Sequence, residues 1–217
     1  VSRINRACEE DRLELYCQPI VAIRPGAEAF RQFELLLRMR DENGQLVQPA
    51  EFIPAAERFN LMPALDRWVV RQACQHLAHK RSADLSRVPY TITINVSTTT
   101  INDEQFLDYV IAEIANADLS PGALCFELTE SAAMTSLAAA THFIRELRSR
   151  GCRFSLDDFG SGLSSFIFLK NLPVDYIKID GSFVHNVAQD MIDRSMVEAI
   201  TRIGRSMGID IIAERVD

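Results

Sequence analysis

The chain has 217 residues, 47% of them hydrophobic, which is enough to bury a large core as a single domain. Its formal net charge of -7 argues against binding long DNA or RNA through a basic face, but leaves room for a small phosphate ligand held by metal ions. The longest apolar runs are far shorter than a membrane span and the N-terminus lacks the pattern of a signal peptide, so we expect a soluble cytoplasmic domain.

The first elements expected along the chain are a short helix and two strands. Residues 2–12 are mostly polar and predict a short exposed helix that leads in from something upstream. A strand follows at residues 13–23, where Pro19 confines it to a sheet edge, a bulge or a strand end. The apolar run within residues 30–38 is typical of a strand covered on both faces. Glu34 inside this run must be paired or functional, because burying a lone carboxylate is prohibitive.

Helical and strand patterns alternate along the rest of the chain. Helices are predicted at residues 49–59, 65–80, 102–117, 137–150, 164–169 and 191–207, and strands at 90–97, 124–129, 153–158, 174–180 and 209–214. Asn102 with Gln105 resembles a capping box at the start of the third helix. Gly151 and Gly208 occupy helix-ending positions.

This alternation argues for a parallel sheet with helices outside it. Such units close into a (β/α) barrel or spread into a doubly wound sheet. No Gly-x-Gly-x-x-Gly or phosphate-loop lysine motif follows the first strands. The sequence therefore favours an α/β fold of the barrel type.

Two adjacent carboxylates, Asp157 and Asp158, end a short buried strand and open into a glycine-rich turn. They would repel one another unless a multivalent cation or another positive partner neutralised them. Adjacent strand residues point to opposite faces, so both side chains reach one site only where the backbone turns. For an isolated pair, a solvated loop with a helix cap is the simpler interpretation.

The pair is not isolated, because polar residues interrupt or end six successive predicted strands. These residues are Glu34, Asn95, Glu127, Asp157 with Asp158, Lys178 with Asp180, and Glu214. In a barrel, the ends of different strands converge on one face and supply the catalytic groups. Oxygen ligands without histidine or cysteine suit magnesium or manganese rather than zinc.

Histidine and cysteine give no competing site. The four histidines, at positions 76, 79, 142 and 185, fall in predicted helices or loops and are expected at the surface or in packing. The five cysteines, at positions 8, 17, 74, 125 and 152, lack Cys-x-x-Cys spacing, which argues against a disulfide framework and a zinc site. We expect them to be small apolar side chains.

Six motifs together resemble the EAL-domain family across essentially the whole chain. They are Tyr-x-Gln-Pro-Ile-Val at 16–21, Phe-Glu-Leu-Leu-Leu-Arg at 33–38, Pro-Ala-Glu-Phe-Ile-Pro at 49–54, Glu-Leu-Thr-Glu at 127–130, Asp-Asp-Phe-Gly-Ser-Gly at 157–162 and Ile-Lys-Ile-Asp-Gly-Ser-Phe-Val at 177–184. The resemblance implies a modified TIM-type barrel, here lacking its final strand and helix. It also implies a phosphodiesterase that hydrolyses cyclic di-GMP to linear pGpG with Mg²⁺ or Mn²⁺.

The resemblance also implies roles for individual residues. One metal would be held by Glu34, Asn95, Glu127 and Asp157, and a second by Asp157, Asp158 and Glu214. The implied catalytic residues are Lys178, Glu214 and Glu130. Lys178 would stabilise charge near the phosphate, although an ion pair with Asp180 is an alternative, and Glu130 would steady the loop after Asp158 or cap the following helix. Substrate contacts would come from Gln18, Leu36, Arg38 and Asp180.

Four positions depart from the family pattern. Leu35 replaces the alanine of the family name, and by strand alternation it faces away from Glu34. Ser161 replaces a frequent threonine and keeps the hydroxyl. Arg215 stands where the family commonly has glycine, and would either crowd the site mouth or contact phosphate. Asp217 replaces a glutamate with a shorter side chain.

We therefore predict a lead-in helix or linker at residues 1–12 and a C-terminally incomplete EAL phosphodiesterase domain at 13–217. Expected partners are cyclic di-GMP, a second copy in a homodimer, and upstream GGDEF or sensory domains, with no polymeric nucleic acid. The location would be cytoplasmic, including the cytoplasmic part of a membrane-anchored protein. Two alternatives remain: a non-hydrolysing cyclic di-GMP receptor, and an unrelated two-metal phosphohydrolase on a similar barrel.

Overall fold

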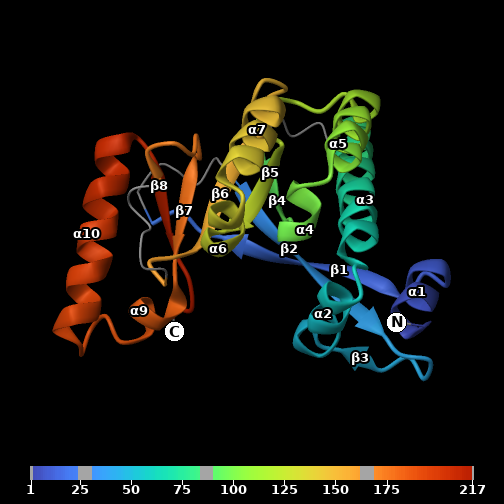
Figure 1. Ribbon diagram of the computed structural model, residues 1–217, viewed down its shortest axis with the longest axis horizontal. Coiled ribbons are helices and arrows are strands. Elements are labelled where there is room, and N and C mark those ends of the chain that lie inside the picture. The colour runs from blue at the N-terminus through green and yellow to red at the C-terminus, as the bar shows by residue number, and fades with distance from the viewer. Residues whose placement is uncertain (1, 24–30, 84–89, 162–168, 217) are drawn as a thin grey trace. The chain divides into compact units, whose positions relative to one another are not determined.

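The computed structural model describes residues 2–23, 31–83, 90–161 and 169–216 (Figure 1). The chain divides into two compact units, residues 1–124 and 125–217, and each is described by itself. Both units alternate strands with helices, as an α/β fold requires. Among the described residues, no helix has the length and apolar character needed to cross a membrane.

The first unit combines a small mixed sheet with helices. Its elements are α1 (Ser2–Glu9), β1 (Leu13–Ile20), β2 (Arg31–Arg40), β3 (Leu46–Val47), α2 (Pro49–Arg58), α3 (Met62–Ala83), β4 (Tyr90–Asn95), α4 (Thr98–Ile101) and α5 (Glu104–Ala117). Strand β2 pairs antiparallel with β1 and β3, and parallel with β4. Pro19 lies in β1, at the edge of this sheet, as predicted.

The antiparallel pairing of β1 with β2 corrects the prediction of a parallel sheet. Only residues 21–30 connect these two strands, and a parallel crossover needs a longer connection. The expectation that β2 is covered on both faces is also wrong, because residues 33–38 are only half-buried. The turn predicted at residues 24–26 lies outside the described residues.

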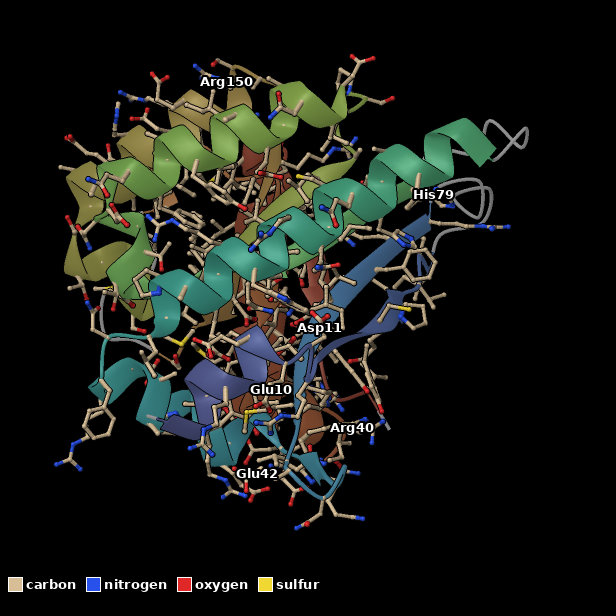
Figure 2. The ribbon with its side chains drawn as sticks, turned by 90° about the vertical axis from the view of Figure 1, so that its right-hand side faces the viewer. Glu10, Asp11, Arg40, Glu42, His79 and Arg150 are labelled. Atoms are coloured by element: carbon tan, nitrogen blue, oxygen red, sulfur yellow. The ribbon has the colours of Figure 1, made fainter. Side chains whose placement is uncertain are left out.

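Helix α1 packs into the core of the first unit. Ile4 and Ala7 are buried against Leu13, Met39 and other apolar residues, so the prediction of an exposed helix is wrong for this face. The polar residues that follow the helix, among them Glu10 and Asp11, are exposed to solvent (Figure 2). The predicted boundary between a lead-in segment, residues 1–12, and the domain at residues 13–217 stays a prediction.

Helices α3 and α5 lie side by side in the first unit (Figure 1). Arg67 of α3 links them through an ion pair of 2.7 Å with Asp103. Asp103 also caps α5, since its side chain accepts a hydrogen bond from the Gln105 N–H. The capping residue is therefore Asp103, and the prediction of Asn102 is wrong, because Asn102 follows the short helix α4.

The second unit holds four parallel strands in the order β5-β6-β7-β8. Its elements are β5 (Leu124–Thr129), α6 (Glu130–Thr135), α7 (Leu137–Arg148), β6 (Arg153–Phe159), β7 (Tyr176–Ile179), α9 (Gly181–His185), α10 (Met191–Met207) and β8 (Asp210–Ala213). Helices α6 and α9 were not predicted. The helix predicted at 164–169 falls almost wholly outside the described residues.

In β5, β6 and β7, side chains alternate between an apolar face and a face that carries the polar residues. Helix α7 covers the apolar face, where Phe143 meets the stacked rings of Phe126 and Phe154 at centroid distances of 5.8 and 6.0 Å. The alternate positions carry Glu127, Ser155, Asp157 and Lys178. The same alternation that builds the core therefore gathers the predicted polar residues on the other face.

The histidines and cysteines lie largely as expected. All four histidines are exposed, including His79 near the end of α3 (Figure 2). The five cysteines are free thiols, and Cys74, Cys125 and Cys152 are buried apolar residues. Cys17 is exposed on β1, so the expectation of a core position is wrong there.

Candidate functional site

A β-bulge at the end of β6 brings Asp157 and Asp158 to the same place. Leu156 pairs with Ile177 and Phe159 with Ile179, so β6 takes one residue more than β7 between these pairs. A bulge breaks the alternation of side chains, and Asp158 has the left-handed φ of 53° at this point. Two adjacent carboxylates can therefore face one site, as the sequence required.

Glu214 completes a cluster with these two residues. It follows β8, and one carboxylate oxygen from each of Asp157, Asp158 and Glu214 lies within 4.8 Å of the others. Burial raises the pKa of Asp158, and the negative charges of Asp157 and Asp180 raise it further. Crowded oxygen donors of this kind fit a hard divalent cation such as Mg²⁺ or Mn²⁺.

Lys178 supplies the positive charge beside these carboxylates. Its Nζ lies 2.7 Å from Oε1 of Glu127, 2.7 Å from Oε1 of Glu214 and 3.5 Å from Oδ1 of Asp157. The lysine side chain is only 2% exposed, and a buried ammonium requires such partners. Lys178 thus joins residues from β5, β6 and the end of β8. Asp180 was suggested by the sequence as the partner of Lys178. In the structure it caps α9, because its Oδ1 accepts a hydrogen bond from the Ser182 N–H.

Glu130 contacts the loop that follows the two aspartates. Its Oε2 accepts a hydrogen bond of 3.0 Å from the Gly160 N–H, and the residue is 4% exposed. Thr129 provides the cap of α6 by accepting from the Ala132 N–H. Of the two roles weighed for Glu130, the contact with the loop is the one that the geometry favours. The Ser161 hydroxyl donates to the Asp158 carbonyl at 2.8 Å and closes the same turn.

Glu34 and Asn95 form a second group, in the first unit. The Asn95 Nδ2 donates to Oε1 of Glu34 at 3.0 Å, and the two residues come from the paired strands β2 and β4. An amide and a carboxylate are both oxygen donors for a hard cation. The predicted ligands are therefore assembled in two groups, one within each unit.

The predicted substrate contacts of β1 and β2 share a face with Glu34. Gln18 is the register partner of Glu34, and Leu36 and Arg38 follow Glu34 at alternate positions. Tyr16, opposite Leu36, was not singled out from the sequence. The guanidinium of Arg38 lies over the Tyr16 ring at 5.5 Å from its centroid, and Tyr16 is 43% exposed. Tyr16 could have been found from the sequence, because it stands two residues before Gln18 on an edge strand and so shares its face.

Arg215 lies directly after Glu214 with a left-handed φ of 50°. Its side chain packs on Gly181 so closely that a Cβ at Gly181 would stand 2.5 Å from Cδ of Arg215. Its positive charge lowers the pKa of Asp158 and partly opposes the effect of burial. Asp217 lies outside the described residues.

Comparison with known families decides the classification, because the model of the EAL domain matches residues 1–217. The chain belongs to the EAL domain family. This EAL domain is 41% identical over 216 residues to the cyclic di-GMP phosphodiesterase PdeB of Shewanella oneidensis, covering 99% of the chain. It is 33% identical over 218 residues to the cyclic di-GMP phosphodiesterase PdeF of Escherichia coli, covering 100% of the chain. The chain spans only 25% and 28% of the length of these relatives.

Solved EAL domains have the same fold. The EAL domain of FimX from Pseudomonas aeruginosa bound to c-di-GMP aligns with a TM-score of 0.87 and 27% identity, over 97% of this chain and 82% of that one. The c-di-GMP complex of the PaMucR phosphodiesterase aligns with a TM-score of 0.87 and 32% identity, over 99% of this chain and 85% of that one. These likenesses confirm the predicted fold class, an α/β fold of the incomplete TIM-type barrel kind.

Proposed function

We propose that this EAL domain is a metal-dependent phosphodiesterase that hydrolyses cyclic di-GMP to linear pGpG. The observation that carries the proposal is the cluster of Asp157, Asp158 and Glu214, with ligand oxygens within 4.8 Å of one another. Lys178 lies at the centre of the neighbouring charges, 2.7 Å from both Glu127 and Glu214. The two relatives at 41% and 33% identity, both named cyclic di-GMP phosphodiesterases, support the same activity.

The proposal assigns two divalent cations, Mg²⁺ or Mn²⁺, to the predicted ligands. By resemblance to the family, Glu34, Asn95, Glu127 and Asp157 would hold one ion, and Asp157, Asp158 and Glu214 the other. When bound, the two cations would lower the pKa of a water molecule and polarise the phosphate. The oxygen-only donors of the cluster and their crowding suit this assignment.

The other site residues act on the substrate and on the ligands. Lys178 presents a fixed positive charge that stabilises the charge developing on the phosphate oxygens. Glu130 holds the loop after Asp158 through the Gly160 N–H, and so orients a ligand without touching the substrate. Arg38 offers a planar set of donors suited to a phosphate, with Gln18, Leu36 and Asp180 as the remaining substrate contacts.

The activity is tested by incubating the chain with cyclic di-GMP and either Mg²⁺ or Mn²⁺ and separating the linear product by chromatography. We expect pGpG from the unmodified chain, and a loss of orders of magnitude in Glu34→Ala and Asp157→Ala while the circular dichroism spectrum keeps its folded shape. Glu198→Gln, which removes an exposed carboxylate from α10, is the matched control and should retain full activity. No product with either ion would defeat the proposal.

A receptor that binds without hydrolysis is the second candidate function. The FimX EAL domain bound to c-di-GMP, with its TM-score of 0.87, supports a binding role for this fold. Calorimetry that detects tight binding without metal, together with no turnover, would favour this candidate. Turnover of other phosphodiesters with none of cyclic di-GMP would instead point to an unrelated two-metal phosphohydrolase.

The partner and location predictions belong to the same proposal. Upstream GGDEF or sensory domains are supported by the length of the relatives, of which the chain spans 25% and 28%. Assembly as a homodimer is testable by sedimentation of the chain with and without cyclic di-GMP. The cytoplasmic location follows from the proposed substrate as an intracellular signal.

A further inference from the structure

We propose that Asp66, a buried carboxylate on α3, is a positioning residue that holds Asn95 in place as a metal ligand. This inference deepens the proposed function and rests on it, because Asn95 is assigned to a metal only there. Asp66 acts on Asn95 by fixing the backbone that follows β4. All the residues concerned lie in the first unit.

Asp66 binds the start of α4 with a single oxygen. Its Oδ2 accepts hydrogen bonds from the Ser97 N–H at 3.0 Å and from the Thr100 hydroxyl at 2.6 Å. Ser97 and Thr100 are themselves joined, with 2.7 Å between their hydroxyl oxygens, and the Ser97 Oγ accepts from the Thr100 N–H. The carboxylate therefore closes a network around the first turn of α4.

This network begins two residues after Asn95. Upstream of Asn95, β4 is fixed by its parallel pairing with β2, in which Thr93 is the partner of Glu34. Downstream, Val96 is buried and the N–H of Ser97 is bound by Asp66. The exposed Asn95 is thus anchored on both sides, and its Nδ2 reaches Oε1 of Glu34 at 3.0 Å.

A carboxylate at this position works against stability. Asp66 is 5% exposed and follows Leu65, which is fully buried in the core. Burial raises the pKa of Asp66 to about 6, although the hydrogen bonds from Thr100 and Ser97 lower it. An apolar residue would be cheaper to bury, so a role at a functional site explains the acid better than core packing does.

Direct measurement of Mn²⁺ binding, without substrate, tests the inference. We expect Asp66→Ala, which removes the acceptor of both hydrogen bonds, to raise the Kd for Mn²⁺ by about tenfold, the lower end of the effect of removing a residue that orients a metal ligand. Asp66→Asn keeps a carbonyl acceptor and should recover most of the affinity. Asp103→Ala is the matched control, because it removes another carboxylate that caps a helix of the first unit but is not bonded to the backbone beside Asn95. The control should change the Kd less than twofold.

The outcomes separate positioning from simple capping. If Asp66→Ala and Asp103→Ala lose similar stability in urea and bind Mn²⁺ equally well, Asp66 is only a cap and the inference is overturned. If Asp66→Ala does not fold, Thr100→Val removes one of the two hydrogen bonds to the carboxylate and should weaken Mn²⁺ binding about threefold, as the loss of one hydrogen bond would, whereas an unchanged Kd overturns the inference. Wild-type protein that binds Mn²⁺ but makes no pGpG would contradict the proposed function and leave this comparison intact.

Discussion

The Nζ of Lys178 lies 2.7 Å from Oε1 of Glu127, and the two side chains are only 2% and 1% exposed. Oε1 of Glu214 lies 2.7 Å from the same nitrogen, so two carboxylates share one ammonium. Removing one partner of a buried ion pair leaves an uncompensated charge and destabilises a protein by about 3 to 5 kcal/mol. Lys178 therefore serves both the fold and the site.

Replacing Lys178 by methionine should make the fold depend on metal. Without the ammonium, the carboxylates around it repel one another, so the free energy of unfolding should fall by about 3 kcal/mol or more in metal-free buffer. Added Mn²⁺ should then raise the melting temperature of Lys178→Met by more than that of the wild type, because a cation restores the missing charge. Differential scanning calorimetry with and without Mn²⁺ measures both effects. Lys170→Met, at an exposed position, is the control, and equal Mn²⁺ shifts in all three proteins would contradict the prediction.

Glu130 should affect turnover through the loop that carries Asp158. Glu130→Ala removes the acceptor of the Gly160 N–H and should lower kcat by about 10 to 100-fold, with little change in the KM for cyclic di-GMP. Glu130→Gln keeps a carbonyl acceptor and should recover most of the activity. Steady-state kinetics of the two variants separates this role from general acid or base catalysis, since in that case glutamine would be as inactive as alanine.

Arg215 should store backbone strain. A residue with a side chain costs about 1 to 2 kcal/mol in the left-handed region, and glycine avoids this cost. Arg215→Gly should therefore be more stable than Arg215→Ala by about 1 kcal/mol in urea unfolding. The opposite order is expected for Arg202→Gly and Arg202→Ala on the exposed face of α10, where glycine lowers helix stability by about 1 kcal/mol. An alanine advantage at both positions would show that Arg215 is not strained.

Asp66 should make stability fall as the pH rises through the weakly acidic range. Its pKa is about 6 in the folded protein, against 3.8 for an unperturbed aspartate. Between these values the folded protein keeps a proton that the unfolded chain has lost, so the stabilisation present below pH 3.8 is lost as the pH rises through about 6. Between about pH 4.5 and 7.5 the loss amounts to about 2 kcal/mol.

Urea unfolding at these two pH values, with Asp66→Asn as the reference, isolates this group from all other titrations. The free energy of unfolding of the wild type should drop relative to the variant by about 2 kcal/mol on going to the higher pH. A constant difference would mean that Asp66 is ionised in the folded state throughout this range.

Elements that span several periods of their own pattern, two residues in a strand and about 3.6 in a helix, followed from local periodicity. The strand at Leu124–Thr129 and the helix at Met191–Met207 have the predicted boundaries, because alternation or helical spacing continues over enough residues to be read. Helices α6 and α9 have six and five residues, too few for a periodic pattern, and are defined by their caps at Thr129 and Asp180. The antiparallel β1–β2 pair depends on the connection between the strands rather than on the pattern within either one.

The sequence by itself determined where the candidate polar residues stand along the chain, since acids and amides at strand ends interrupt otherwise apolar runs. Only the tertiary structure decided how they meet. Lys178 and Glu127 are 51 positions apart, and their contact depends on the register of β5, β6 and β7 and on the bulge at Asp157 and Asp158. In the sequence, Asp66 is likewise only one polar residue in a predicted helix. Its contact with Ser97, 31 positions away, exists only in the folded chain. Register and such distant contacts arise from packing across whole faces, which no local stretch of sequence contains.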